Sequence, residues 1–307
     1  MIFKKLVKIF IQTLITTTAV MGLVIWLLGF LPDYATFDEV FDKSSKLDSK
    51  VYASGFFDSQ WQFWRGVFAD DFGVSRSTRD QSVGDFLRQD GKVSFFLFLG
   101  SLVFTIFSAA LLGLICAYYQ GRFFDRVVGL LGLLMTSLPS FLLIPLLIYF
   151  FALKWSLFPP GLWEGPRSLV LPIIALSLRP IFFLARLFQE QLMASSRAPF
   201  VTAARAKGLG VMTLWSHHII PNSLNGFVVA SGNLFGQLVT GSFLVELLFA
   251  LPGLGALMVK SLAQRDYPIF LGVVLLFTLV LQLGHRLSEL ILSSVVKAEL
   301  VDQDWVA

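Results

Sequence analysis

Long apolar segments separated by shorter polar ones dominate the chain. The apolar segments are residues 9–31, 95–119, 127–153, 169–188, 226–249 and 269–292. Each is close to the roughly 20 residues that an α-helix needs to cross the hydrocarbon of a bilayer. The pattern therefore predicts an all-α membrane protein with six transmembrane helices.

The first apolar segment follows a lysine-rich start, Lys4, Lys5 and Lys8, which is also how a secretory signal peptide begins. The segment is longer than the roughly 7 to 15 apolar residues of a signal peptide, and no small-residue cleavage pattern follows it. We therefore expect a retained first span whose N-terminus is cytoplasmic.

Basic residues predict the orientation of the remaining spans. Arg122 and Arg126 flank the turn between the second and third spans. The turn between the fourth and fifth spans is flanked by Arg186, Arg197, Arg205 and Lys207. Because short cytoplasmic loops are enriched in Lys and Arg, both regions and the C-terminus are expected inside, with loops 154–168 and 250–268 outside. The polar segment 33–94 is expected outside as well, either contacting a partner or as a solvated loop. We divide the chain into residues 1–94, the first span and external segment, and 95–307, a core domain with five spans.

Composition agrees with a membrane protein, because 56% of the residues are hydrophobic, 14% are charged and the mean hydropathy is +0.75. The net charge of +4 is small and unevenly placed, so it bears on membrane orientation and not on nucleic-acid binding. The single cysteine, Cys116, lies in an apolar run and can form no internal disulfide.

The polar stretch 195–225 interrupts the apolar pattern and predicts two short helices. Pro199 suits a first helical position, and Gly208 suits a left-handed cap that ends the first helix. Arg205 and Lys207 fall in its last turn, where positive charge is favoured. A face formed by one large and two small side chains would let another protein approach closely; it consists of Phe200, Ala203 and Ala204.

The second short helix is predicted at about residues 211–218. Pro221, with Asn222 and Ser223, is expected to end this helix and to cap the span that follows.

Residues in this stretch carry a resemblance to a known family. The order Thr202, Ala203, Ala204, Gly208 and Pro221, within TAARAKGL and HIIPNSL, resembles the cytoplasmic loop of ABC-importer permeases of the dipeptide, oligopeptide and nickel branch. The resemblance implies a type I importer permease fold, in which this loop docks into a separate ATPase subunit. An amphipathic interfacial loop without a partner is the alternative.

A second motif agrees with the first. Its residues match the family's Glu, its Pro-Gly-Leu-Gly turn and its Asp-Tyr-Pro before the last span; they are Glu246, Pro252, Gly253, Leu254, Gly255, Asp266, Tyr267 and Pro268. The resemblance covers residues 1–292, most closely after residue 169. The final VVKAELVDQDWVA departs from the family's usual ending.

Two apolar spans contain polar residues that a lipid-facing helix would not need. Asn233, Gln237 and Thr240 recur at helical spacing in the fifth span, and such a stripe marks either helix packing or a water path. Gly232 and Gly236 form a small-xxx-small pair that permits close packing. Arg179 departs from the family pattern and falls near mid-span, so it is expected to meet a partner or an aqueous pathway. With Glu246, these polar residues are candidates for a translocation pathway.

Some chemistry is missing from the sequence. No phosphate-binding Gly-rich motif is present, so ATP and Mg²⁺ are expected on separate ATPase subunits and no cofactor on this chain. His217, His218 and His285 lack metal-ligand spacing, and His218, which matches a family position, is interpreted as structural. No hydrolase motif supports a membrane enzyme.

The resemblance implies a chain in the inner membrane with four kinds of partner: a second homologous permease subunit, two ATPase subunits, an external solute-binding protein and membrane lipid. The function expected is half of a peptide translocation pathway. A self-contained channel or secondary carrier is the alternative, as is a permease of the same family for nickel or another solute.

Overall fold

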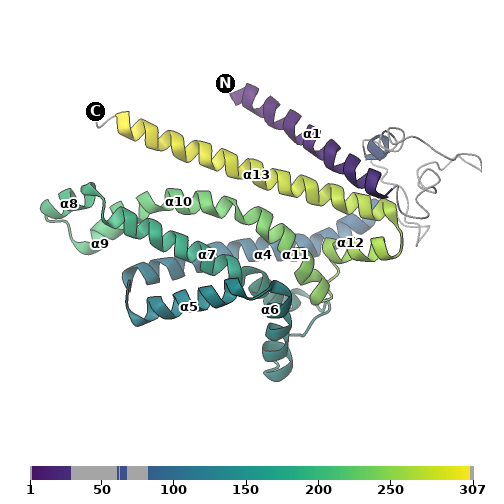
Figure 1. The fold of residues 1–307 in the computed structure, drawn as a ribbon, viewed down its shortest axis with the longest axis horizontal. Helices are drawn as coiled ribbons and strands as arrows, with labels where there is room; N and C mark the ends of the chain where they lie inside the picture. The colour runs from purple at the N-terminus through teal and green to yellow at the C-terminus, as the bar shows by residue number, and fades with distance from the viewer. Residues whose placement is uncertain (1, 29–60, 62, 68–81, 305–307) are drawn as a thin grey trace, which may run out of the picture. The chain divides into compact units, whose positions relative to one another are not determined.

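The structure is a computed structural model that describes residues 2–28, 61, 63–67 and 82–304, and in these ranges it contains helices and no β-strand (Figure 1). Most of the predicted external segment 33–94 lies outside the described residues. The helices are α1 (Ile2–Leu28), α4 (Val83–Tyr118), α5 (Phe123–Ser137), α6 (Ser140–Leu147), α7 (Val170–Ser196), α8 (Pro199–Ala206), α9 (Val211–Leu214), α10 (Ile220–Gly232), α11 (Leu234–Leu248), α12 (Leu254–Ala263) and α13 (Tyr267–Asp304). Ile148–Lys154 and Trp215–Ile219 are π-helical, and Pro166–Leu169 is a 3-10 turn.

The prediction of an all-α protein with six spans is confirmed. Four helical segments of the described chain are long and apolar enough to cross a bilayer, and the number rises to six when each of two bent pairs of helices is taken as one span. The bent pairs are 123–137 with 140–154, at 112°, and 211–232 with 234–248, at 41°. α4 begins at Val83, which is earlier than the predicted boundary at residue 95.

The third span is not the single helix that its apolar length predicts. Leu138 takes an extended conformation (ψ 130°) between α5 and α6, and Pro139 follows it. A residue before proline is sterically pushed out of the helical region, so α5 ends here. The helix restarts at Ser140 in a new direction, which produces the 112° bend.

The chain forms two compact units, residues 1–96 with 250–282, and residues 97–249 with 283–307. In the first unit, α1 packs against the start of α13 through an apolar cluster that includes Met21, Ile25 and Leu271. Polar side chains join the same helices, because Gln282 accepts a hydrogen bond from Thr16 (2.7 Å) and donates one to Thr17 (2.8 Å).

The first unit also contains a helix that the sequence pattern did not predict. Residues 250–268 were expected to be a loop, but α12 occupies Leu254–Ala263. Gly253 precedes α12 in an extended conformation, and the amide of Leu254 donates to Ser94 Oγ at 2.8 Å. An orphan donor at the helix start is therefore satisfied by a side chain distant in sequence.

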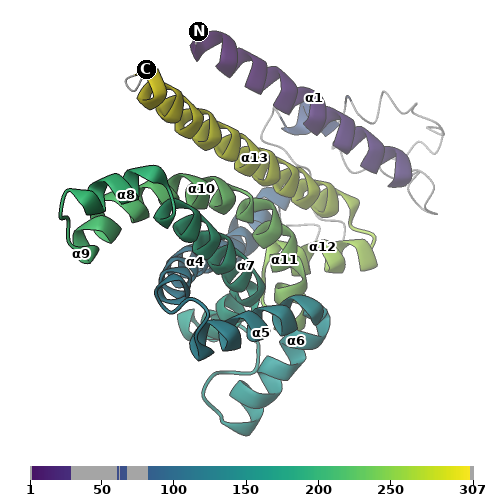
Figure 2. The same cartoon turned by 60° about the vertical axis from the view of Figure 1, so that its left-hand side comes forward.

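α7 is the central helix of the second unit, where it contacts α5, α6, α10 and α11 (Figure 2). Most of its buried positions are apolar, as at Leu184, Phe188 and Leu192. α4 approaches α7 closely at Gly113, where any Cβ would lie 2.7 Å from the carbonyl oxygen of Ala185. A larger residue at this position would push the two backbones apart.

Candidate functional site

The loop between α7 and α10 contains the predicted capped helix. Pro199 is the first residue of α8, and Gly208 has φ +80°, so both predictions are confirmed. Gly208 N–H donates to Arg205 O (2.9 Å) and Leu209 N–H donates to Ala204 O (3.3 Å). These two bonds form a Schellman motif, which satisfies carbonyls that the helix end would otherwise leave unpaired.

α8 does not present the face that the sequence predicted. Ala204, expected to face outward with Phe200 and Ala203, is only 8% exposed, and Val201 is 2% exposed. Residues three apart share one side of a helix, so Val201 and Ala204 form the inner side of α8, which contacts α9. Phe200 and Ala203 remain outward, together with the exposed Thr202, Arg205 and Lys207.

Pro221 was predicted to end the second helix of the loop, but the helix continues through it. α9, the π-helical turn Trp215–Ile219 and α10 follow one another without a break, and Pro221 lies in the first turn of α10. The amide of Ile220 donates to Trp215 O, five residues back, just before the proline that has no amide hydrogen to donate. The wider π turn therefore carries the helix through a residue that normally interrupts one.

A buried hydroxyl joins the two helices at the base of this loop. Ser223 of α10 is fully buried, and its Oγ lies 2.9 Å from Ser195 Oγ, 3.2 Å from Gln191 O and 2.7 Å from Ile219 O. Phe188 of α7 and Phe227 of α10 also contact each other, with ring centroids 4.5 Å apart and ring planes tilted by 49°. α7 and α10 are thus held together where they enter and leave the loop.

The two loop histidines differ in their surroundings. His217 is exposed and its Nδ1 lies 2.7 Å from Ser216 Oγ, whereas His218 is partly buried. His218 lies in the π-helical turn before Pro221, which fits the interpretation that it is structural.

A cavity of about 550 Å³ lies between α5, α6, α7 and α11 in the second unit. It brings together three of the predicted pathway residues, Arg179, Gln237 and Thr240. Thr136 and Ser140, from the two sides of the bend in the third span, complete its polar lining.

Arg179 binds that bend directly. Its Nη1 donates to Ser140 Oγ (2.8 Å) and its Nη2 donates to Thr136 O (3.1 Å). Thr136 lies in the last turn of α5, where carbonyls lack intrahelical partners and carry partial negative charge. The guanidinium therefore compensates the broken helix end.

The other predicted pathway residues lie elsewhere. Asn233 is exposed at the junction of α10 and α11, and Glu246 is fully buried; neither lines the cavity. Of the glycine pair, Gly232 packs closely, since a Cβ there would lie 2.6 Å from Ser288 Oγ, whereas Gly236 has open space.

The residues of the second motif lie at the ends of α12 and α13. Gly253 and Gly255 are buried at the start of α12, and Pro252 is exposed just before them. Asp266, Tyr267 and Pro268 are buried at the start of α13, where Asp266 O accepts the amide of Phe270 at 3.1 Å.

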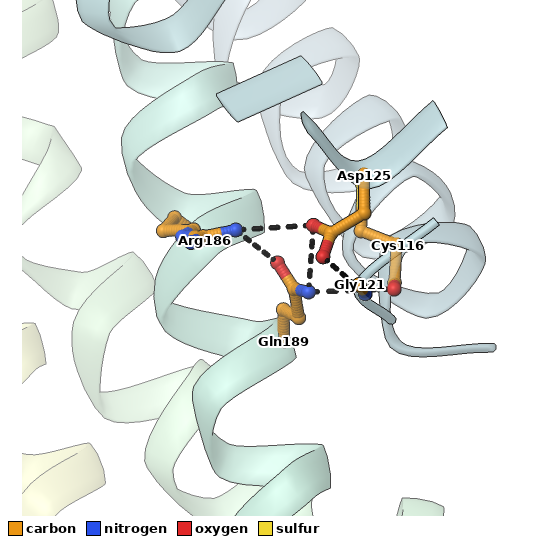
Figure 3. A network of polar contacts seen from close by, with 5 residues as sticks. All are labelled: Cys116, Gly121, Asp125, Arg186 and Gln189. Carbon is orange, nitrogen blue, oxygen red and sulfur yellow. Dashed lines mark hydrogen bonds and ion pairs between the residues drawn. The ribbon is translucent and has the colours of Figure 1, made fainter. Parts of the chain in front are cut away.

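Sequence reasoning missed a polar network at the turn between α4 and α5 (Figure 3). Asp125 accepts hydrogen bonds from the Gly121 amide (2.9 Å), from Gln189 Nε2 (2.9 Å) and from Arg186, with which it forms a 3.1 Å ion pair. Gln189 also accepts from Arg186 (2.8 Å) and donates to Cys116 O (3.3 Å). A lone carboxylate in the basic, aromatic turn GRFFDR was the available signal. The network fastens this turn to α7.

Known proteins resemble this chain in sequence and in fold. Residues 109–296 match the family described as binding-protein-dependent transport system inner membrane component. The chain belongs to this family. The dipeptide transport system permease protein DppB of Bacillus subtilis is 34% identical over 71% of this chain and 71% of its own. The oligopeptide transport system permease protein OppB of Escherichia coli is 32% identical over 67% of this chain and 68% of its own.

Two solved structures share the fold of this inner membrane component at low identity. One is an amino acid ABC transporter, with a TM-score of 0.54 and 16% identity over 69% of this chain and 94% of that one. The other is the MetNI methionine ABC transporter, with a TM-score of 0.51 and 19% identity over 68% of this chain and 97% of that one. The resemblance stated from the two sequence motifs is thus confirmed as family membership.

Proposed function

We propose that this inner membrane component forms half of a translocation pathway for di- and oligopeptides and is driven by ATP hydrolysed on two separate subunits. A second homologous permease subunit would form the other half, and an external binding protein would deliver the solute. ATP and Mg²⁺ would bind the ATPase subunits and not this chain. The peptide cargo is supported by the names of the two relatives, both of which are peptide permeases.

The observation that carries the proposal is the construction of the loop at the ends of α7 and α10 (Figure 1). α8 is short, closed by the Gly208 cap, and exposes Phe200 and Ala203. One large and one small outward side chain suit docking into a groove of another protein. We therefore assign α8 the role of contacting an ATPase subunit.

Movement of α8 has a physical route to the cavity. The buried contacts of Ser223 hold α10 to α7, and α7 carries Arg179 in the cavity wall. α11, which carries Gln237 and Thr240 on the facing wall, follows α10 after a single residue. A displacement at the loop would thus change the distance between the two walls.

The proposal includes an orientation. The loop 195–225 and both chain ends would lie in the cytoplasm, and the segment around α12 would lie outside. The support for it is the distribution of Lys and Arg along the sequence.

Co-expression tests the proposal. The tagged chain should be recovered from membranes together with the second permease subunit and both ATPases, and the reconstituted complex should import labelled peptides only with ATP and the binding protein. Transport by the chain alone would instead favour a channel or secondary carrier. ATP-dependent uptake of Ni²⁺ without uptake of peptides would retain the subunit role and overturn the cargo.

A further inference from the structure

Arg179 is a charged side chain within a span, about a third of the way along α7. It lies nine positions after Val170, or about 14 Å along a helix whose full length is about 40 Å. A charge at that depth is costly unless the protein or water solvates it.

The bend of the third span uses only part of this guanidinium. An arginine side chain has five N–H donors, and Ser140 Oγ and Thr136 O take one each. In the part of the chain that the structure describes, no carboxylate lies within ion-pair distance of Arg179. The other guanidinium N–H groups and the positive charge of Arg179 are thus held in a fixed position, with no counterion among the described residues.

The rest of the cavity is suited to a small polar group. Arg179 is the one charged side chain among its described lining residues, and Gln237 and Thr240 face it from α11. The side-chain amide of Gln237 makes no hydrogen bond within the described chain, so it can donate to a ligand. A volume of about 550 Å³ is in the range of small-molecule sites.

A second cavity of about 520 Å³ lies next to the Arg179 cavity. It is lined by Arg186 and Gln189 of α7, and the two cavities share Thr136 and Phe183 in their linings. Arg179 therefore has a neighbouring cavity along the same helix.

We propose that the Arg179 cavity is an anion subsite of the transport path that takes the C-terminal carboxylate of a peptide. The inference rests on the proposed function and adds the chemical group that the path recognises. Arginine presents a planar pair of donors that matches a carboxylate, and its two bonds to the bend fix its orientation in advance. Ser140 and Thr136 hold the guanidinium from within the chain and leave its other donors for the ligand.

The first experiment measures the local charge without any transport. Thr240→Cys, in a Cys116→Ala background, is labelled in the assembled complex with an anionic and with a cationic methanethiosulfonate. The ratio of the anionic to the cationic rate should fall roughly three- to tenfold on adding Arg179→Gln. Arg179→Lys should preserve the ratio, and so should Arg167→Gln, which removes an exposed charge from the 3-10 turn outside the cavity.

The second experiment measures peptide import by the assembled complex. Arg179→Gln should reduce uptake of a free-acid peptide at least threefold more than uptake of the same peptide as its amide, each normalised to the parent complex. Arg179→Lys should lie between, since lysine keeps the charge but not the paired donors. A peptide pair that the parent complex imports measurably in both forms is the substrate.

Each outcome has one meaning. Equal loss of acid and amide uptake, or an unchanged labelling ratio, overturns the subsite. Failure of Arg179→Gln to assemble with the second permease subunit, while Arg179→Lys assembles, overturns it in favour of a subunit contact. If the parent complex imports no peptide, the proposed function fails, and the labelling ratio still tests the anion site.

Discussion

Substitution of Gly208 tests whether the cap of α8 matters for function. Gly208 has φ +80°, a conformation in which a Cβ costs roughly 1 to 2 kcal/mol. A Cβ built at this position meets no atom within 4 Å, so backbone strain is the whole penalty inside the chain. Such a penalty lowers the equilibrium constant between the capped and the uncapped loop by a factor of roughly 5 to 30.

The series Gly208→Asn, Gly208→Ala and Gly208→Val should reduce ATP-coupled uptake in that order. Asparagine tolerates the left-handed region best, and a β-branched residue tolerates it least. We expect Gly208→Val to abolish transport. Protein level in the membrane should stay constant across the series, because the change lies outside the spans.

Gly210 supplies a matched control two residues away. It too has no atom within 4 Å of a built Cβ, but its φ is −67° and its ψ 155°, which suit any residue. Gly210→Ala and Gly210→Val should therefore leave uptake close to the parent level. If the Gly208 and Gly210 variants were equally impaired, or Gly208→Asn were as damaging as Gly208→Val, the strain argument would be refuted.

Three further predictions concern orientation and internal contacts. Single cysteines at Ser216 and Glu164, in the Cys116→Ala background, should react with an impermeant reagent from opposite sides of the membrane; reaction of both from one side contradicts the orientation. Asp125→Asn should lower the free energy of unfolding of the purified chain by about 1 kcal/mol, because it weakens the charge-assisted hydrogen bonds to Asp125. The ion pair with the exposed Arg186 contributes little to this value. An unchanged melting curve would count against the network. Ser223→Ala should reduce ATP-coupled uptake while ATPase recovery persists, and parent-level uptake would exclude a role for the hydroxyl in coupling.

Features determined by short stretches of sequence were predictable. The six spans follow from apolar length, and the cap of α8 follows from Pro199 and Gly208 at fixed positions. Each depends on residues within a few positions of one another, so no knowledge of the tertiary fold was needed.

Features that depend on distant contacts were not predictable in the same way. The burial of Ala204 depends on tertiary packing, and two of the partners of Asp125, Arg186 and Gln189, lie more than sixty residues away on α7. Pro221 shows a different limit, because the rule that proline ends a helix was overridden by a π turn. The bend at Leu138 and Pro139 carried a local signal, because Thr136, Ser137 and Ser140 flank it, but the total apolar length of the segment suggested one helix.

The unbroken course of α9, the π turn and α10 makes the two arms of the loop mechanically unequal. Val211–Gly232 is a single rod about 33 Å long. On the other side, α7 stops at Ser196 and α8 starts at Pro199, with Ala198 extended at ψ 150°, so that arm contains a joint. A force applied at α8 would rotate α8 about this joint, while the rigid Val211–Gly232 helix would transmit the displacement into the bilayer. The loop would then act as a lever with one hinge. The displacement would reach Asn233, where this helix ends and the second half of the span begins.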